Sequence, residues 1–370
     1  MKVLVLTNLG MGLYKFRKEL LEELVQQGYE VTLAMPHDEY VSIFEALSCK
    51  FVEVPLDRRG TNFIADFKTL ISYMKIIRIE QPDIVLTYTV KPNVYGGMAC
   101  AWMNVPYIAN VTGLGTAFER KNLLSLIAKN LYRFGLRKAQ CVFFQNNVNM
   151  KFFTDNCLIK RKKKLIPGSG VNLKQYAYSQ YPPDDTIRFL FIGRIMKAKG
   201  VEELFEAARF IKSKYKNVYF DIIGFCEESY QNTIDSLHES GIVVFHGKQS
   251  DVRGFIQKAH AVIHPSYHEG LSNVLLESAA MGRPVLASNV PGCIETFNES
   301  QSGFGFEVKN AQALIDAIER FISLPHQEKK AMGESGRIKV ENEFSRDIVV
   351  ASYLEEIRAK GDNHESIRFT

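Results

Sequence analysis

Long apolar runs are missing from this sequence of 370 residues. No stretch approaches the roughly 18 apolar residues that a membrane-spanning helix needs. The first apolar run, Val3–Leu6, is too short for the core of a signal peptide. The six cysteines include no C-x-x-C pair and are scattered through apolar segments, as free thiols in a reducing compartment would be. We therefore expect a cytoplasmic protein, or one on the cytoplasmic side of a membrane.

Several catalytic signatures are also absent. The sequence has no Asp-x-Asp to anchor a metal-held diphosphate and no G-x-S-x-G nucleophile elbow. Gly10–Gly12 lacks the third glycine and the later acidic residue of a dinucleotide fingerprint, so Gly12 more plausibly allows close approach of a substrate. His260, His264 and His268 are spaced by four, but Pro265 breaks any helix there. We expect neither a metal site nor a cofactor.

The net charge of +5 is mild, but basic residues concentrate in the first half of the chain. They are Arg120, Lys121, Lys129, Arg133, Arg137 and Lys138, followed by the run Lys160–Lys164. These residues form either a solvated face with a basic loop, or a surface that attracts anionic lipid or a phosphate-bearing substrate. No nucleic-acid module accompanies them, so we expect no nucleic-acid partner.

The length suits two domains of roughly 150–200 residues, and both repeat the same pattern. The run Val3–Leu6, a helical repeat ending at Gly28 and the run Val31–Ala34 predict a βαβ unit with parallel strands. After the turn Pro182–Asp185 the pattern restarts at Phe189–Gly193. We predict two doubly wound, Rossmann-like α/β domains facing across a cleft. Their expected limits are 1–170 and 187–345, with a C-terminal helix and tail at 346–370. Further strands are expected at 84–87, 107–109, 141–144, 218–223, 243–245, 261–263 and 284–287.

Two segments at predicted strand ends carry groups suited to a nucleotide sugar. In Ser266–Glu277, Ser272 or Asn273 can cap a helix whose first amides favour an anion. Glu269 and Glu277 can then accept hydrogen bonds from a sugar and a ribose. In Gly193–Gly200, Arg194 and Lys199 offer fixed positive charge to a diphosphate without a metal. The alternatives are a structural capped helix with surface glutamates, and an ordinary basic loop.

These segments resemble the family-4 glycosyltransferases. Glu269 and Glu277 match the family's E-x7-E motif, and Gly193–Gly200 matches its G-R-x4-K-G element. Gly168–Asn172 resembles its interdomain G-V-D segment, with Asn172 where aspartate is usual. The resemblance implies a GT-B fold, metal-independent catalysis and retention of anomeric configuration. It implies catalytic roles for Glu269, Arg194 and Lys199. The implied donor-binding residues are Gly12, Gly193, Gly270, Leu271, Ser272, Asn273 and Glu277.

The first half resembles transferases of bacterial surface-glycan assembly, including undecaprenyl-diphosphate-linked N-acetylgalactosaminyltransferases. Tyr14–Arg17, Thr87–Gly96 and Asn110–Gly115 carry this resemblance, which implies a polyprenyl-diphosphate acceptor. The acceptor-binding candidates are Arg17, Lys91 and Thr112. One departure is that many family members carry a histidine near the donor sugar where this chain has Thr112-Gly113.

The stretch 120–138 also mixes leucines with basic residues, as a helix lying at an anionic membrane surface would, or as one packed on its own sheet. The function expected from all this is retaining transfer of a hexose or N-acetylhexosamine from a UDP-sugar to a lipid-linked or growing surface glycan, as in capsule or lipopolysaccharide synthesis. We place the enzyme at the inner face of the cytoplasmic membrane. The alternatives are a nucleotide-sugar 2-epimerase of similar architecture and a non-catalytic sugar-nucleotide binding protein.

Overall fold

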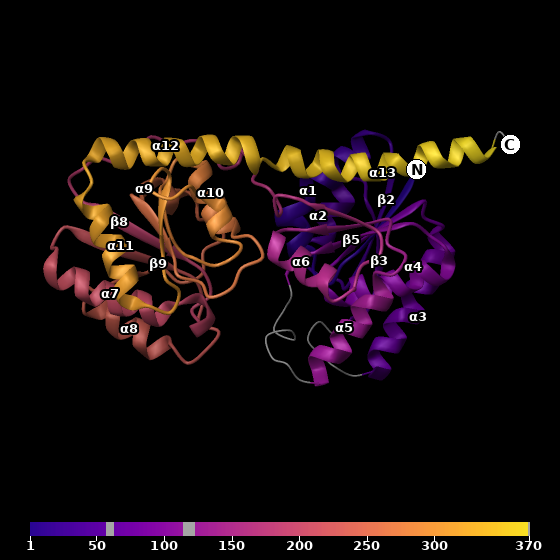
Figure 1. The fold of residues 1–370 in the computed structure, drawn as a ribbon, viewed down its shortest axis with the longest axis horizontal. Coiled ribbons are helices and arrows are strands. Elements are labelled where there is room, and N and C mark those ends of the chain that lie inside the picture. Colours follow the sequence, from indigo (N-terminus) through magenta and orange to yellow (C-terminus); the bar gives the residue numbers. More distant parts are fainter. Residues whose placement is uncertain (57–62, 114–122, 369–370) are drawn as a thin grey trace. The chain divides into compact units, whose positions relative to one another are not determined.

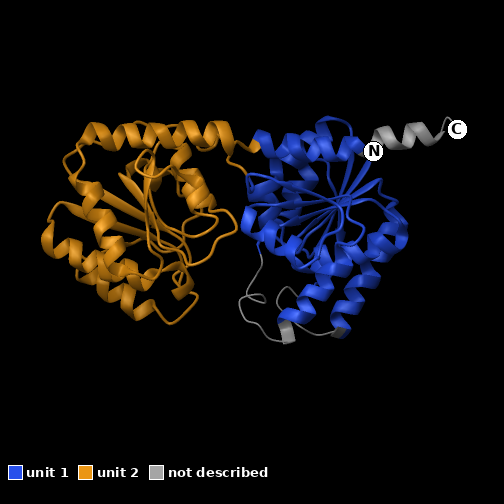
Figure 2. Ribbon diagram, viewed as in Figure 1, with its two compact units in different colours: residues 1–169, 347–370 blue, residues 170–346 orange. Residues whose placement is uncertain are grey.

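The computed structural model describes residues 1–56, 63–113 and 123–368, which form two compact units (Figure 1, Figure 2). Unit 1 holds residues 1–169 together with the C-terminal helix from residue 347, and unit 2 holds residues 170–346. Residues 171–186, which lie between the two predicted domains, therefore belong to unit 2. The C-terminal helix belongs to unit 1.

Unit 1 contains a seven-stranded parallel sheet in the order β3-β2-β1-β4-β5-β6-β7. Its strands are β1 (Lys2–Leu6), β2 (Glu30–Met35), β3 (Lys50–Glu53), β4 (Ile84–Tyr88), β5 (Tyr107–Val111), β6 (Cys141–Phe144) and β7 (Lys162–Leu165). Its helices are α1 (Gly10–Gln26), α2 (Val41–Ala46), α3 (Phe63–Glu80), the π-helix η1 (Pro92–Gly96), α4 (Gly97–Met103), α5 (Leu123–Gly135), α6 (Asn147–Asp155) and α13 (Arg346–Arg368).

Unit 2 contains a six-stranded parallel sheet in the order β10-β9-β8-β11-β12-β13. Its strands are β8 (Ile187–Ile192), β9 (Val218–Ile223), β10 (Val244–Phe245), β11 (Ala261–His264), β12 (Val285–Ser288) and β13 (Gly303–Phe306). Its helices are the 3-10 turn η3 (Lys197–Lys199), α7 (Val201–Lys214), α8 (Gln231–Glu239), α9 (Arg253–Lys258), α10 (Asn273–Ala280), the 3-10 turn η4 (Ile294–Thr296), α11 (Ala311–Ser323) and α12 (His326–Glu343).

Both units are doubly wound sheets, which confirms the predicted fold class. In each sheet the central strands are buried on both faces, and their apolar runs are what made them recognisable in the sequence. The strand order reverses between β1 and β4 in unit 1 and between β8 and β11 in unit 2. Ligands of such sheets bind outside the carboxyl ends of the strands at this reversal. In unit 2 those strand ends lead into the two segments predicted to bind the donor.

The basic run Lys160–Lys164 is not a loop, because most of it forms the edge strand β7. Two of its lysines pair with glutamates of α13. Lys162 lies 2.6 Å from the buried carboxylate of Glu356, and Lys164 lies 2.5 Å from Glu355. These ion pairs attach the C-terminal helix to the sheet edge. The charge of Lys162 and Lys164 therefore serves the fold of unit 1, which leaves less of the run for an external anion.

The predicted helix at 120–138 is present as α5, and its described side chains point both inward and outward. Arg120 and Lys121 lie outside the described residues, as do the side chains of Leu123 and Leu124. Tyr132 is buried in the core beneath the sheet, whereas Leu126 and Phe134 are more than half exposed. The helix therefore packs on its own sheet and still presents apolar side chains to solvent.

No helix in residues 1–56, 63–113 and 123–368 is both long enough and apolar enough to cross a bilayer.

Candidate active site

The two donor-side segments lie against each other at the carboxyl edge of unit 2. The loop after β8 carries Gly193–Gly200, and the loop after β11 carries residues 265–272. The Tyr267 N–H donates to the Ala198 carbonyl at 2.9 Å. Gly200 has φ +68°, and a Cβ there would lie 2.0 Å from the Pro265 carbonyl oxygen. Only glycine permits this approach, because a side chain would have both the strained conformation and the clash.

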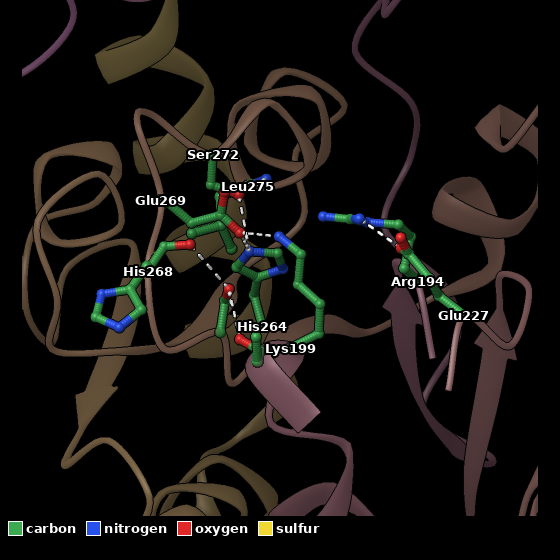
Figure 3. A network of polar contacts seen from close by, with 10 residues as sticks. Arg194, Lys199, Glu227, His264, His268, Glu269, Ser272 and Leu275 are labelled. Carbon is green, nitrogen blue, oxygen red and sulfur yellow. Dashed lines mark hydrogen bonds and ion pairs between the residues drawn. The ribbon is translucent and has the colours of Figure 1, made fainter. Parts of the chain in front are cut away.

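This contact brings Lys199 and Glu269 together (Figure 3). Lys199 Nζ donates to Glu269 Oε1 at 2.5 Å, and both side chains are less than one fifth exposed. The same carboxylate oxygen lies 2.8 Å from Nε2 of His264, the last residue of β11. Burial alone would raise the pKa of Glu269. The hydrogen bond from His264 and the charge of Lys199 outweigh burial and hold that pKa well below its usual range. Glu269 is therefore a carboxylate at neutral pH.

Arg194 also comes from the loop after β8 but has a different partner. Its Nη1 donates to Glu227 Oε2 at 2.5 Å, and its side chain is almost half exposed (Figure 3). Glu227 follows β9, so a third strand end contributes to the same edge. In this structure each of the two predicted diphosphate cations, Arg194 and Lys199, is paired with a carboxylate of unit 2.

Ser272 is the N-cap of α10, as predicted, and its Oγ accepts from the Leu275 N–H at 3.5 Å. One part of the prediction needs correction. The Ser272 N–H donates to the Gly292 carbonyl at 2.8 Å, so this amide is used inside the unit. Gly292 has φ +86°, and a Cβ there would come within 2.8 Å of the Glu269 and Gly270 carbonyls. Leu271 is buried beside this turn, while Gly270 and Asn273 are half-buried.

Glu277 lies about one turn into α10 and is half-buried. It accepts a hydrogen bond from the hydroxyl of Tyr176, whose pKa is raised by burial and by this carboxylate. Sequence reasoning missed Tyr176 because a hundred residues of chain separate it from Glu277. It also missed Glu227, Gly292 and the contact between His264 and Glu269. For His264 a signal existed, since a histidine ending a strand just before the Glu269 loop is well placed to reach it.

The acceptor-side candidates lie in unit 1, and two of them, Arg17 and Lys91, are less exposed to an external ligand than expected. Arg17 is 4% exposed, and its guanidinium lies 5.4 and 5.6 Å from the ring centres of Tyr88 and Tyr353. Lys91 is largely buried and lies 2.7 Å from Asp66. Both basic side chains therefore have partners in the fold of unit 1.

Gly12 and Thr112 remain accessible. A Cβ at Gly12 would meet nothing within 4 Å, which is the open space that close approach of a substrate requires. Thr112 is exposed just beyond the end of β5. The Gly10 amide, by contrast, donates to Asp38 at 2.7 Å and is not free for an external anion.

Among the described residues, no group of three histidines, cysteines or carboxylates could hold a metal ion. His260, one of the three spaced histidines, bonds to the Arg188 N–H through Nδ1 and to the Pro183 carbonyl through Nε2. Its imidazole therefore serves the packing of the segment that precedes β8.

Comparison with known proteins supports this description. Residues 178–339 match the family described as glycosyl transferases group 1, and residues 2–146 match the family described as glycosyl transferase 4-like. The chain is 27% identical over 335 residues to the N,N'-diacetylbacillosaminyl-diphospho-undecaprenol alpha-1,3-N-acetylgalactosaminyltransferase of Campylobacter jejuni, covering 86% of this chain and 88% of that one. It is 22% identical over 353 residues to the UDP-Gal:alpha-D-GlcNAc-diphosphoundecaprenol alpha-1,3-galactosyltransferase of Escherichia coli, covering 90% of each.

A solved structure shares the fold. The crystal structure of HepE from Anabaena in complex with UDP superimposes with a TM-score of 0.79 at 16% identity, covering 97% of this chain and all of that one. The two family matches together span most of the chain. The match over residues 2–146 lies in unit 1, and the match over residues 178–339 lies in unit 2. The chain belongs to the family-4 glycosyltransferases and has their two-domain GT-B fold.

Proposed function

We propose that this glycosyltransferase moves a hexose or N-acetylhexosamine from a UDP-sugar to a polyprenyl-diphosphate-linked or growing bacterial surface glycan, with retention and without a metal. The observation that carries the proposal is the buried Lys199–Glu269 pair. It lies at the carboxyl ends of the central strands of unit 2, beside the capped start of α10. The names of the two bacterial relatives support the lipid-linked acceptor, and that of the Escherichia coli enzyme supports a UDP-sugar donor.

The chemistry follows from where the charges lie. Departure of UDP breaks the bond between the sugar C1 and the β-phosphate oxygen and leaves negative charge on the diphosphate. Arg194 and Lys199 supply fixed positive charge for it, which is most effective when water is excluded. The acceptor hydroxyl attacks the same face, forms the new C1–O bond and gives its proton to the departing phosphate oxygen. Glu269 accepts hydrogen bonds from the donor sugar, and Glu277 from the ribose.

Product analysis tests this proposal against its main alternative. The enzyme is incubated with a panel of UDP-sugars, with and without a short-chain polyprenyl-diphosphate sugar. We expect a new glycolipid only when the acceptor is present, and NMR of its anomeric centre should show the donor's configuration. An epimerised UDP-sugar formed without acceptor would instead identify a 2-epimerase. UDP-sugar binding with no product under any condition would identify a binding protein.

Transfer should survive metal chelation. Arg194 and Lys199 replace a bound ion in this proposal, so an excess of EDTA is expected to change the initial rate by less than about twofold. The measurement is a rate assay with EDTA, compared with the same enzyme given magnesium or manganese. Full loss of activity with EDTA, restored by either metal, would contradict the metal-free mechanism.

A lipid-linked acceptor requires unit 1 to approach a membrane, and one surface of unit 1 suits this. Between α4 and α5 lies a groove of about 550 Å³ lined by Met98, Ala101, Trp102, Phe134, Arg137 and Lys138, which we call the aromatic–basic groove. Trp102 and Phe134 are 62% and 58% exposed. Tryptophan favours the boundary between lipid and water, and cations favour anionic headgroups. We therefore propose that the enzyme works peripherally at the inner face of the cytoplasmic membrane.

Liposome flotation tests this placement. We expect binding to anionic vesicles that weakens at high salt and is small for neutral vesicles. Arg137→Ala should weaken anionic binding about fivefold, since a basic residue near such a surface adds roughly 1 kcal/mol. Trp102→Ala should weaken binding to both anionic and neutral vesicles. Phe210→Ala is the matched control, because it removes an exposed aromatic side chain from α7 of unit 2. Negligible binding in all conditions would contradict the membrane placement and leave a transferase with a soluble acceptor.

A further inference from the structure

His264 has an unusual set of contacts beneath the Lys199–Glu269 pair (Figure 3). Its side chain is 3% exposed, and its Nε2 lies 2.8 Å from Glu269 Oε1 and 3.2 Å from Ser272 Oγ. Lys199 Nζ contacts the same Oε1. One carboxylate oxygen thus accepts from two side chains. One of them comes from the end of β11 and the other from the loop after β8.

The contacts of the ring identify which nitrogen carries the proton. His264 Nδ1 is buried and has no hydrogen-bond partner among the described residues. A proton on Nδ1 would therefore be buried without an acceptor. A bare Nε2 would face the Glu269 carboxylate with two lone pairs opposed at 2.8 Å. The geometry therefore places a proton on Nε2, which donates it to Glu269.

This arrangement matters because Lys199 has two possible anionic partners. In this structure it pairs with Glu269, and in the proposed function it must contact the diphosphate of the donor. Its departure removes one donor from a carboxylate that is only 16% exposed. A buried carboxylate without a partner is costly, so Glu269 would otherwise resist releasing Lys199.

We propose that His264 is a positioning residue for Glu269, whose Nε2–H holds the carboxylate in place so that Lys199 can exchange Glu269 for the donor's diphosphate. The inference rests on the proposed function, since it assumes that UDP is the nucleotide part of the donor. His264 is also tied to the cap of α10, because Ser272 Oγ is near its Nε2 and accepts from the Leu275 amide. The carboxylate thus has a contact with the framework of unit 2 that does not depend on Lys199.

Other charged groups near this site do not replace His264. Glu295 accepts from the Gly292 amide at 2.7 Å, on the turn that packs against the Glu269 backbone. The Cys293 thiol has a pKa raised by burial and by the charge of Glu269, and is neutral. His268, in the same loop, is exposed. Among these groups of the described chain, only Lys199 and His264 contact the Glu269 carboxylate and neutralise or orient it.

UDP titration calorimetry on four variants tests the inference. Among the described residues, His264→Leu leaves Lys199 as the sole partner of the Glu269 carboxylate, so the Kd for UDP should rise about tenfold. His264→Gln keeps an N–H donor and should stay within about threefold of wild type. Glu269→Ala frees Lys199, so UDP should bind at least as tightly as to wild type. The double variant His264→Leu/Glu269→Ala should then have a Kd for UDP less than about twofold above that of Glu269→Ala alone. His238→Leu, an exposed histidine of α8, is the matched control.

The double variant separates positioning from a purely structural role. If His264→Leu weakens UDP binding equally with and without Glu269, the histidine supports the fold and the inference is wrong. An unchanged Kd in His264→Leu would also overturn it, as would a tenfold loss in His264→Gln when its melting temperature matches that of wild type. Failure of the wild-type protein to bind UDP would instead contradict the proposed function, which keeps the two failures distinct.

Discussion

Lys199→Ala is expected to lower the turnover of sugar transfer by about a hundredfold, which is the typical cost of removing one charged or hydrogen-bonding group from a site that stabilises a leaving anion. Arg194→Ala should have an effect of the same order. In the proposed mechanism the diphosphate departs from a site where these two side chains carry the fixed positive charge. Initial rates at saturating UDP-sugar measure this effect.

Lys197→Ala is the matched control for both variants. Lys197 belongs to the same loop, but its side chain is 63% exposed and pairs with Glu202 at 3.0 Å. Its removal should leave the rate within about twofold of wild type, as is usual for an exposed ion pair. Normal turnover in both Arg194→Ala and Lys199→Ala would remove the diphosphate role from this loop.

Glu269→Gln should slow transfer by roughly one hundredfold while UDP binding is retained, because the carboxylate contacts the sugar and not the nucleotide in the proposed mechanism. Glu277→Ala should do the opposite, with UDP binding weakened about tenfold and a smaller loss of turnover at saturation, as expected when uniform binding is lost. Calorimetric titration of UDP and steady-state rates on the same preparations separate the two roles.

The control for Glu277→Ala is Tyr176→Phe, which removes the hydroxyl that donates to Glu277 but keeps the ring. It should weaken UDP binding less than loss of the carboxylate does. If Glu269→Gln loses UDP and Glu277→Ala keeps it, the two glutamates have exchanged roles relative to this account.

The sequence predicted the fold well where burial is strong and poorly where it is not. Strands such as β4 and β6 are buried along their whole length, so their apolar runs identified them. The missed strands have other compositions. β7 is almost entirely lysine, and it is a strand because it pairs with β6 and its lysines pair with glutamates of α13. No local pattern contains that information, since the partners lie about 190 residues away.

The placement of the candidate donor-binding residues was predictable for a related reason. Arg194, Lys199, Glu269 and Glu277 lie in two short segments that follow strand ends, so spacing alone placed them at one sheet edge. The spacing could not show which side chains contact each other. The Glu269–His264 contact depends on the angle at which β11 ends, and the Glu277–Tyr176 bond depends on a segment far away in the chain.

The acceptor-side candidates have contacts that the sequence could not show. Arg17 belongs to the segment Tyr14–Arg17, whose resemblance to surface-glycan transferases made it a candidate for the acceptor diphosphate. In the fold it lies between Tyr88 of β4 and Tyr353 of α13, and the second ring comes from the opposite end of the chain. Lys91 is likewise occupied by Asp66 of α3. Of the three acceptor candidates, only Thr112 keeps an exposed side chain.

The central claim is that unit 2 activates a UDP-sugar for transfer to a lipid-linked acceptor with its own cations. The most direct test is mass spectrometry of the lipid fraction after incubation of the enzyme with UDP-sugars, a polyprenyl-diphosphate sugar and excess EDTA. We predict an acceptor heavier by one hexose or N-acetylhexosamine for the wild-type enzyme, and about a hundredfold less of it for Lys199→Ala. An unchanged lipid acceptor with every UDP-sugar, in an enzyme that still binds UDP, would contradict the account.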